Sequence, residues 1–134
     1  MYFFFFYYFI EGIISILIYF RLVFTSSLST IEVIESFLAQ FSNNTQENLN
    51  PFKFKSTWLR DYDYFTLTGD TSGPKRKRYV DQFNDKKNTR ARLFIISTKA
   101  GGLGINLTGA NRVVIFEPSW NPCDDIQCTY RIFR

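Results

Sequence analysis

Histidine is absent from this sequence of 134 residues, and cysteine occurs only twice. The two cysteines, Cys123 and Cys128, form no CxxC pair. Structural zinc sites are built from clusters of cysteine and histidine, and a Ser-His-Asp site needs an imidazole as its general base. The sequence therefore lacks both patterns, and we expect no metal ligands in the chain. Two isolated cysteines indicate reduced thiols in an intracellular protein.

Negative charge is in short supply, since 12 Asp and Glu face 16 Lys and Arg and the formal net charge is +4. The basic residues are also unevenly spread, because 12 of the 16 lie between Lys53 and Lys99. A basic cluster of this kind indicates a polyanionic partner. The length suits one globular domain and is short for two.

Only the first twenty residues form a long hydrophobic run. Residues 1–20, MYFFFFYYFIEGIISILIYF, contain a single charge at Glu11, are just long enough to span a bilayer as a helix, and lack the basic start of a secretory signal. Three interpretations stay open: a membrane anchor, a buried segment of the domain, or a leader that is not native to it. We favour the third, because nothing after Phe20 resembles a membrane protein.

Residues 21–134 alternate between strand and helix patterns. Leu93–Ser97 (LFIIS) and Val113–Phe116 (VVIF) are continuous apolar runs, which are typical of strands buried on both faces of a parallel sheet. Alternating strands and helices predict an α/β fold, with a parallel sheet flanked by helices. A polar loop is expected at residues 42–51. The expected strands are 21–26, 64–67, 93–97 and 113–116, and the expected helices are 30–41, 73–83 and 124–134.

Hydroxyl-rich or glycine-rich residues follow each expected strand. They are Thr25-Ser26, Gly69 to Thr71, Ser97 to Lys99, and Pro118 to Trp120. Ligands of open parallel sheets bind at the carboxyl ends of the strands, where hydroxyls and free backbone amides can hold phosphate. The segment AGGLGINL (Ala100–Leu107) is compatible with a phosphate contact or with a tight turn that packs closely.

Two arginines share one face of the last expected helix. Arg131 and Arg134 are three residues apart, with Gln127 about one turn before Arg131. Guanidiniums so placed can stabilise the charge on a transferring phosphate, or they can form a solvated basic helix end. Two interpretations also stay open for the run Lys75–Arg78 (KRKR): it forms a solvated helix face, or it serves as a phosphate contact or nuclear-import signal.

The string STKAGGLGINLTGANRVVIFEPSWNP (Ser97–Pro122), followed by DIQCTYRIFR (Asp125–Arg134), closely resembles motifs V and VI of the sucrose-non-fermenting-type remodelling ATPases of helicase superfamily 2. LVFTSSLSTIEVIESFL (Leu22–Leu38) resembles motif IV, and YFTLTGDTSGPKRKRYVDQFND (Tyr64–Asp85) is similar to the block that follows it. WLRDYDYF (Trp58–Phe65) resembles the ATRX-like subfamily. The resemblance implies the second RecA-like lobe of such a motor, a P-loop NTPase-type fold without its P-loop, here incomplete at both ends.

The resemblance also implies which residues would meet the nucleotide. Motif VI assigns arginine fingers to Arg131 and Arg134 and a nucleotide-side contact to Gln127. Motif V assigns nucleotide-side positions to Gly104 and Asn106.

A second set implied by the resemblance would touch the DNA backbone, a mode of contact that carries no sequence information. Thr68 stands where the family usually has Asp, and Asp70 where it usually has Ser, so this set departs from the family at one turn. The implied DNA-contacting residues are Thr25, Ser26, Gly69, Thr71, Thr98 and Lys99.

The chain carries no GxxxxGK[ST] loop and no Asp-Glu pair, which a motor needs to cradle phosphates and hold magnesium. We therefore expect no ATP hydrolysis by the chain alone, and use of ATP with magnesium only beside a first RecA-like lobe. The other expected partner is double-stranded DNA or the nucleosome, with the nucleus as the location and a membrane role disfavoured. The alternative is a non-catalytic nucleic-acid or lobe-docking module, which would bind DNA in a salt-sensitive way without turnover.

Overall fold

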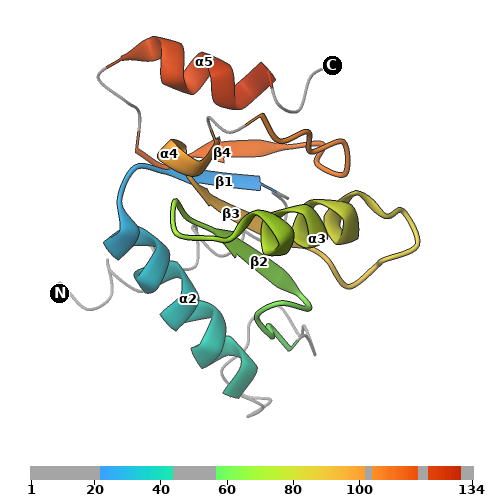
Figure 1. The fold of residues 1–134 in the computed structure, drawn as a ribbon. Coiled ribbons are helices and arrows are strands. Elements are labelled where there is room, and N and C mark those ends of the chain that lie inside the picture. The colour runs from blue at the N-terminus through green and yellow to red at the C-terminus, as the bar shows by residue number, and fades with distance from the viewer. Residues whose placement is uncertain (1–21, 44–56, 102–103, 118–120, 131–134) are drawn as a thin grey trace, which may run out of the picture.

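The computed structural model describes residues 22–43, 57–101, 104–117 and 121–130. Within this part of the chain, four strands form one parallel sheet in the order β2-β3-β1-β4 (Figure 1). The expected α/β class, with a parallel sheet flanked by helices, is confirmed. The strands are β1 (Leu22–Thr25), β2 (Tyr64–Leu67), β3 (Leu93–Ser97) and β4 (Val113–Ile115), and the helices are α2 (Leu28–Asn43), α3 (Gly73–Asn84), α4 (Thr98–Gly101) and α5 (Pro122–Tyr130).

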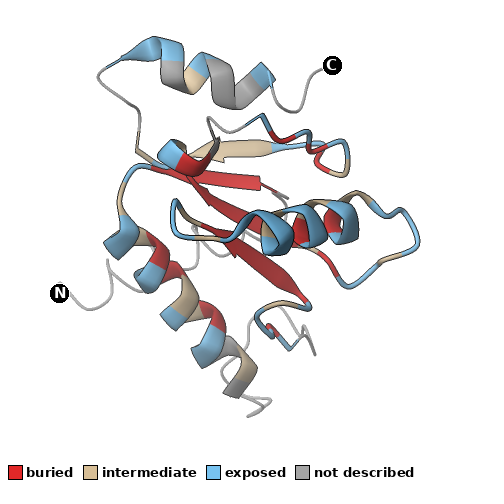
Figure 2. Ribbon diagram, viewed as in Figure 1, coloured by how far each residue is buried: buried red, intermediate tan, exposed pale blue. Residues whose placement is uncertain are grey.

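Strands β1, β2 and β3 are buried, as their red colour in Figure 2 shows, whereas the edge strand β4 is of intermediate burial. Successive side chains of a strand point to opposite faces, so each strand contributes to two cores. On one face, Val23 and Ile95 pack with Ile31, Ile34 and Leu38 of α2. The apolar residues of α2 recur at helical spacing, which is why this helix covers the sheet.

The other face carries an aromatic core beneath α3. The ring centres of Phe65 in β2 and Tyr79 are 4.9 Å apart. The ring centres of Phe94 in β3 and Phe83 are 5.2 Å apart, and these two rings meet edge to face. Tyr79 and Phe83 are one helical turn apart and are the buried residues of α3. The segment that follows α4 packs into the same core through Ile105, Leu107 and Ala110.

The observed element bounds agree with the expected ones to within a few residues, except that the short helix α4 was not expected. β2 and β3 have the predicted limits, but α2 ends at Asn43 and thus extends into the expected loop at 42–51. The extension has a physical reason, because the Ser42 hydroxyl at the end of α2 accepts the backbone N–H of Trp58 at 2.6 Å. Residues 1–20 and 44–51 lie outside the described residues. No helix in the described ranges is long and apolar enough to cross a membrane.

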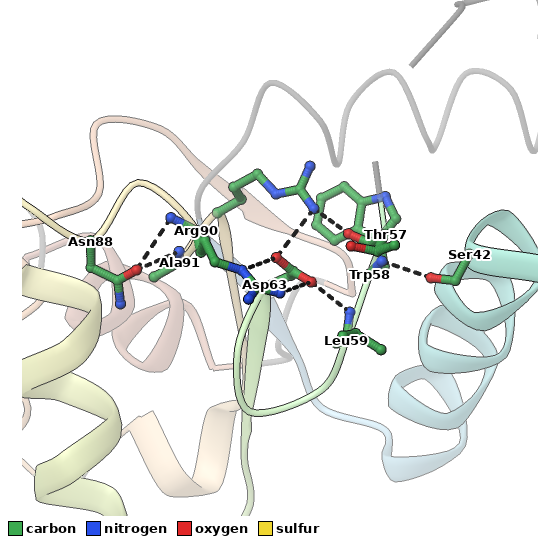
Figure 3. A network of polar contacts seen from close by, with 9 residues as sticks. Ser42, Thr57, Trp58, Leu59, Asp63, Asn88, Arg90 and Ala91 are labelled. Carbon is green, nitrogen blue, oxygen red and sulfur yellow. Dashed lines mark hydrogen bonds and ion pairs between the residues drawn. The ribbon is translucent and has the colours of Figure 1, made fainter. Parts of the chain in front are cut away.

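A buried carboxylate organises the amino-terminal edge of the sheet (Figure 3). Asp63, only 3% exposed, comes just before β2 and accepts two hydrogen bonds from the Arg90 guanidinium at 3.2 and 3.3 Å. Its Oδ2 also accepts the Leu59 N–H at 2.9 Å. A buried carboxylate is tolerated only when it is paired and hydrogen-bonded, and Asp63 is both.

Arg92 ties the same edge to Trp58. Its guanidinium lies 3.6 Å from Asp63 Oδ1 and 4.1 Å from the centre of the Trp58 ring, a cation–π distance. The hydrogen bond to Asp63 raises the pKa of Arg90, whereas burial lowers the pKa of Arg92. Ion pairs and a cation–π contact among the residues that precede β2 and β3 therefore stabilise the amino-terminal edge of the sheet.

Candidate nucleotide and nucleic-acid interface

The carboxyl ends of the four strands meet at one edge of the sheet, as parallel pairing requires. The register pairs Thr25 of β1 with Ser97 of β3, and Leu67 of β2 with Ile96. The residues that follow these strands are therefore neighbours in space. The structure thus brings together the three expected groups of DNA-contacting residues: Thr25-Ser26, Gly69–Thr71 and Thr98-Lys99.

Exposure differs among these residues. Thr25 is completely buried, while Ser26, Gly69 and Lys99 are exposed and Thr71 and Thr98 are partly buried. Lys99 lies on α4, the short helix that begins directly at the end of β3, where Ser97 Oγ accepts the Ala100 N–H at 3.3 Å. The exposed residues can contact a ligand that runs along this edge, whereas the buried Thr25 hydroxyl forms its hydrogen bonds within the protein.

The partner of that hydroxyl is Glu117, which follows β4. Thr25 and Ser26 donate to Glu117 Oε2 at 3.1 and 2.9 Å, and Thr30 donates to Oε1 at 2.8 Å. These hydrogen bonds, that from Thr30 foremost, hold the pKa of the Glu117 carboxyl below its usual value. One carboxylate therefore fixes the end of β4 to the β1–α2 junction.

The turn between β2 and α3 is closed by its own hydroxyls. Thr71 Oγ1 accepts the Thr68 N–H at 3.0 Å, and the Thr71 N–H donates to the Thr68 carbonyl at 3.1 Å. Arg76 of α3 reaches back to the Thr71 carbonyl at 3.2 Å. Gly69 and Asp70 form the exposed tip of this turn, next to the basic start of α3 at Lys75–Arg78.

Gly104 and Asn106, the two residues expected on the nucleotide side, lie on the segment between α4 and β4. Ile105 and Leu107 of this segment are buried at 8% and 0% exposure, whereas Gly104 and Asn106 are exposed. Gly104 adopts a left-handed φ of +73°, which glycine reaches without strain, and a Cβ there would meet no atom within 4 Å. The backbone at Gly104 is thus open to a ligand.

The segment is held from the far end of α3 rather than from the sheet edge. Asn84, the last residue of α3, donates from Nδ2 to the Asn106 carbonyl and accepts the Gly109 N–H at Oδ1, both at 2.9 Å. Because α3 begins at the Gly69–Thr71 turn, Asn106 lies about one helix length from that turn. The structure therefore keeps the Asn106 end of the segment apart from the carboxyl edge of the sheet, where the DNA contacts were expected.

The expected arginine fingers and their neighbour are described less fully. Arg131 and Arg134 lie outside the described residues. Gln127 falls within α5, a helix that contacts α4 and so lies over the same end of the sheet (Figure 1). The helix itself was expected at residues 124–134, and it begins two residues earlier, at Pro122.

Sequence reasoning missed Glu117 and Asn84. Glu117 sits inside the motif V string, but its role depends on three hydroxyls about 90 residues earlier in the chain, which only the sheet order brings near. Asn84 carried a visible signal, since an Asn at a helix end is suited to bonding nearby backbone. The sequence could not name the distant loop that it holds.

Comparison with known proteins places the whole described region in one group. The family described as helicase conserved C-terminal domain matches residues 22–134. "Transcriptional regulator ATRX" of Homo sapiens is 49% identical over 116 residues, which cover 84% of this chain and 5% of that protein. "Helicase ARIP4" of Xenopus tropicalis is 45% identical over 119 residues, which cover 84% of this chain and 8% of that protein. The chain thus spans a small fraction of the length of these relatives.

A solved structure gives the same result. "Crystal structure of the C-terminal part of Fun30 ATPase domain" superposes with a TM-score of 0.63 and 33% identity, covering 85% of this chain and 30% of that chain. The resemblance to the sucrose-non-fermenting-type lobe, and within it to the ATRX-like subfamily, is confirmed by these matches. The fold and the family are therefore supported by the sheet topology as well as by the comparisons.

Proposed function

The chain belongs to the helicase conserved C-terminal domain family, and from this premise we propose that it acts as the second motor lobe of an ATP-driven DNA translocase of the chromatin-remodelling kind. The observation that carries the proposal is the carboxyl edge of the sheet, where exposed hydroxyl, backbone and ammonium groups from three adjacent strand ends are gathered. Phosphate is the ligand that such groups suit best.

Under this proposal the DNA backbone runs along that edge. Lys99 supplies a positive charge, and Gly69, Thr71 and Thr98 supply backbone and hydroxyl donors. Ser26 donates to Glu117, so a phosphate at that end of the edge has to compete with the carboxylate for the hydroxyl. Thr25 contributes indirectly, because its buried hydroxyl anchors Glu117.

The nucleotide side would be formed by Gly104, Asn106 and Gln127, with Arg131 and Arg134 as arginine fingers. The open left-handed backbone at Gly104 fits a ligand that approaches the chain closely. ATP would supply the free energy for stepping, and this lobe's part is to bind it, orient it and stabilise charge on the transferring phosphate.

Magnesium and the phosphate-binding lysine belong to the first lobe in this proposal. In the described ranges, no three His, Cys, Asp or Glu side chains are grouped so as to hold a metal ion. The partners are then a first RecA-like lobe and double-stranded DNA or the nucleosome. A nuclear location follows from the same proposal, supported by relatives named as transcriptional regulators.

A chimera tests the function directly. Residues 22–134 would replace the matching segment of the Fun30 ATPase domain, and DNA-stimulated ATP hydrolysis would be measured. We expect activity in the chimera, and a loss of about 10³-fold in Arg131→Ala or Arg134→Ala, the range known for arginine fingers. Lys86→Ala, which removes an exposed positive charge between α3 and β3 at the opposite edge of the sheet, is the control and should retain activity. A folded chimera that binds DNA but never hydrolyses ATP would support the non-catalytic binding module instead.

A further inference from the structure

Both polar ends of the Asn84 side chain are engaged by the segment that carries Gly104 and Asn106. The amide nitrogen donates to the Asn106 carbonyl, and the amide oxygen accepts the Gly109 N–H, each at 2.9 Å. An amide side chain can donate and accept at the same time without carrying charge. Asn84 therefore forms hydrogen bonds with the segment at two backbone positions, Asn106 and Gly109, which are three residues apart.

The packing around these hydrogen bonds is close. A Cβ on Gly109 would stand 2.3 Å from the carbonyl oxygen of Phe83, so the backbones of α3 and the segment touch where Gly109 lies. Ile105 and Leu107 enter the aromatic core that Phe83 also helps to form. The segment therefore packs against the end of α3, and the two hydrogen bonds of Asn84 hold it there.

We propose that Asn84 is a positioning residue for the nucleotide, acting through the Gly104–Asn106 backbone that it holds. This inference rests on the proposed function, which assigns Gly104 and Asn106 to the nucleotide side. The backbone carbonyl of Asn106 accepts the hydrogen bond from Asn84. Asn106 itself is exposed and lies two positions after Gly104, whose backbone is open. Fixing the carbonyl on one side of the segment fixes the direction in which Asn106 and Gly104 face on the other.

The first test uses the full 134-residue chain and measures amide hydrogen exchange. Asn84→Ala removes both bonds, and we expect the Gly109 amide to exchange about 10-fold faster. Asn84→Asp keeps the acceptor for Gly109 but loses the donor to Asn106 at neutral pH. Near pH 4, where aspartate becomes protonated, it regains that donor. Protection of residues 104–109, corrected for the intrinsic rate, should then recover in Asn84→Asp and not in Asn84→Ala.

The second test uses the chimera with the Fun30 ATPase domain and separates positioning from mere stability. A positioning role predicts that Asn84→Ala raises the KM for ATP about 10-fold and changes kcat less than twofold. A purely structural role lowers the amount of active enzyme and leaves KM unchanged, which would overturn the inference. Unchanged exchange in Asn84→Ala would overturn it as well.

The two tests also keep this inference distinct from the proposed function. A chimera that is inactive with Asn84 in place counts against the motor function. The exchange experiment still decides whether Asn84 holds the segment, because it requires neither ATP nor a first lobe. Asn88→Ala, which removes an amide whose bonds lie within residues 82–91, is the matched control and should leave the Gly109 amide unaffected.

Discussion

Glu117 receives three hydroxyl hydrogen bonds, and its carboxyl pKa is lowered as a result. A group whose pKa is lower in the folded state stabilises the fold above its unfolded pKa, about 4.3, and that contribution is lost as the pH falls through the folded value. We expect Glu117→Gln to lower the free energy of unfolding by about 1 kcal/mol at pH 7. The difference from the wild type should shrink below about pH 4. Urea denaturation at both pH values measures this, and a difference that does not vary with pH would contradict it.

Gly109 illustrates a glycine required by close approach. A methyl group there would overlap the Phe83 carbonyl at 2.3 Å, and the main chain on both sides is held in the core. We expect Gly109→Ala to destabilise the chain by about 1–3 kcal/mol. Gly73→Ala is the control, because a Cβ at the start of α3 meets nothing within 4 Å. Thermal unfolding should separate the two variants, and equal midpoints would show that the contact is relieved without cost.

At the level of the elements, Asp63 joins the starts of β2 and β3. Its carboxylate pairs with Arg90 and Arg92 and accepts the Leu59 N–H (Figure 3). Asp63→Asn removes the charge while keeping the shape, and it leaves Arg92 stacked on Trp58 without its ionic partner. We expect a loss of about 2 kcal/mol, below the full value for a buried pair because Arg90 is half exposed.

The matched control for Asp63→Asn is Asp81→Asn, on the exposed face of α3. It removes one negative charge as well, so a general effect of net charge would appear in both variants. Chemical denaturation compares them. A loss of stability in Asp81→Asn as large as that in Asp63→Asn would show that the buried network contributes nothing specific.

How far the sequence predicted these elements depended on the kind of signal each carried. β3 was placed correctly because its uninterrupted apolar run, LFIIS, is typical of a strand buried on both faces. β2 was placed correctly because its YFTL run is closed by the turn residues Thr68, Gly69 and Asp70. The predicted end of α2 was wrong because Ser42 resembles a loop residue in the sequence. Its hydrogen bond with the Trp58 N–H is a tertiary contact, which the local sequence pattern does not reveal. The sheet-edge grouping followed from the rule for parallel strands, whereas the Glu117 and Asn84 contacts depend on pairs of residues far apart in sequence.

Over the whole molecule, basic groups are found at both edges of the sheet, and only one edge is proposed to meet DNA. Lys99 lies at the carboxyl edge, and Lys87 lies at the opposite edge between α3 and β3. Lys99→Ala should reduce the slope of log affinity for duplex DNA against log salt by about 1. Lys87→Ala removes the same charge and should leave the slope unchanged. Fluorescence anisotropy at several salt concentrations measures both, and equal slopes in the two variants would contradict the assignment.

The strand order has a consequence for how this chain reaches its fold. β1 comes first among the described strands, yet it pairs with β3 and β4, roughly 70 and 90 residues further along the chain. A ribosome therefore has to release most of the domain before Leu22, Val23 and Phe24 find their partners. Until then this apolar strand lacks its neighbours in the sheet, so chaperone binding or aggregation competes with folding at β1.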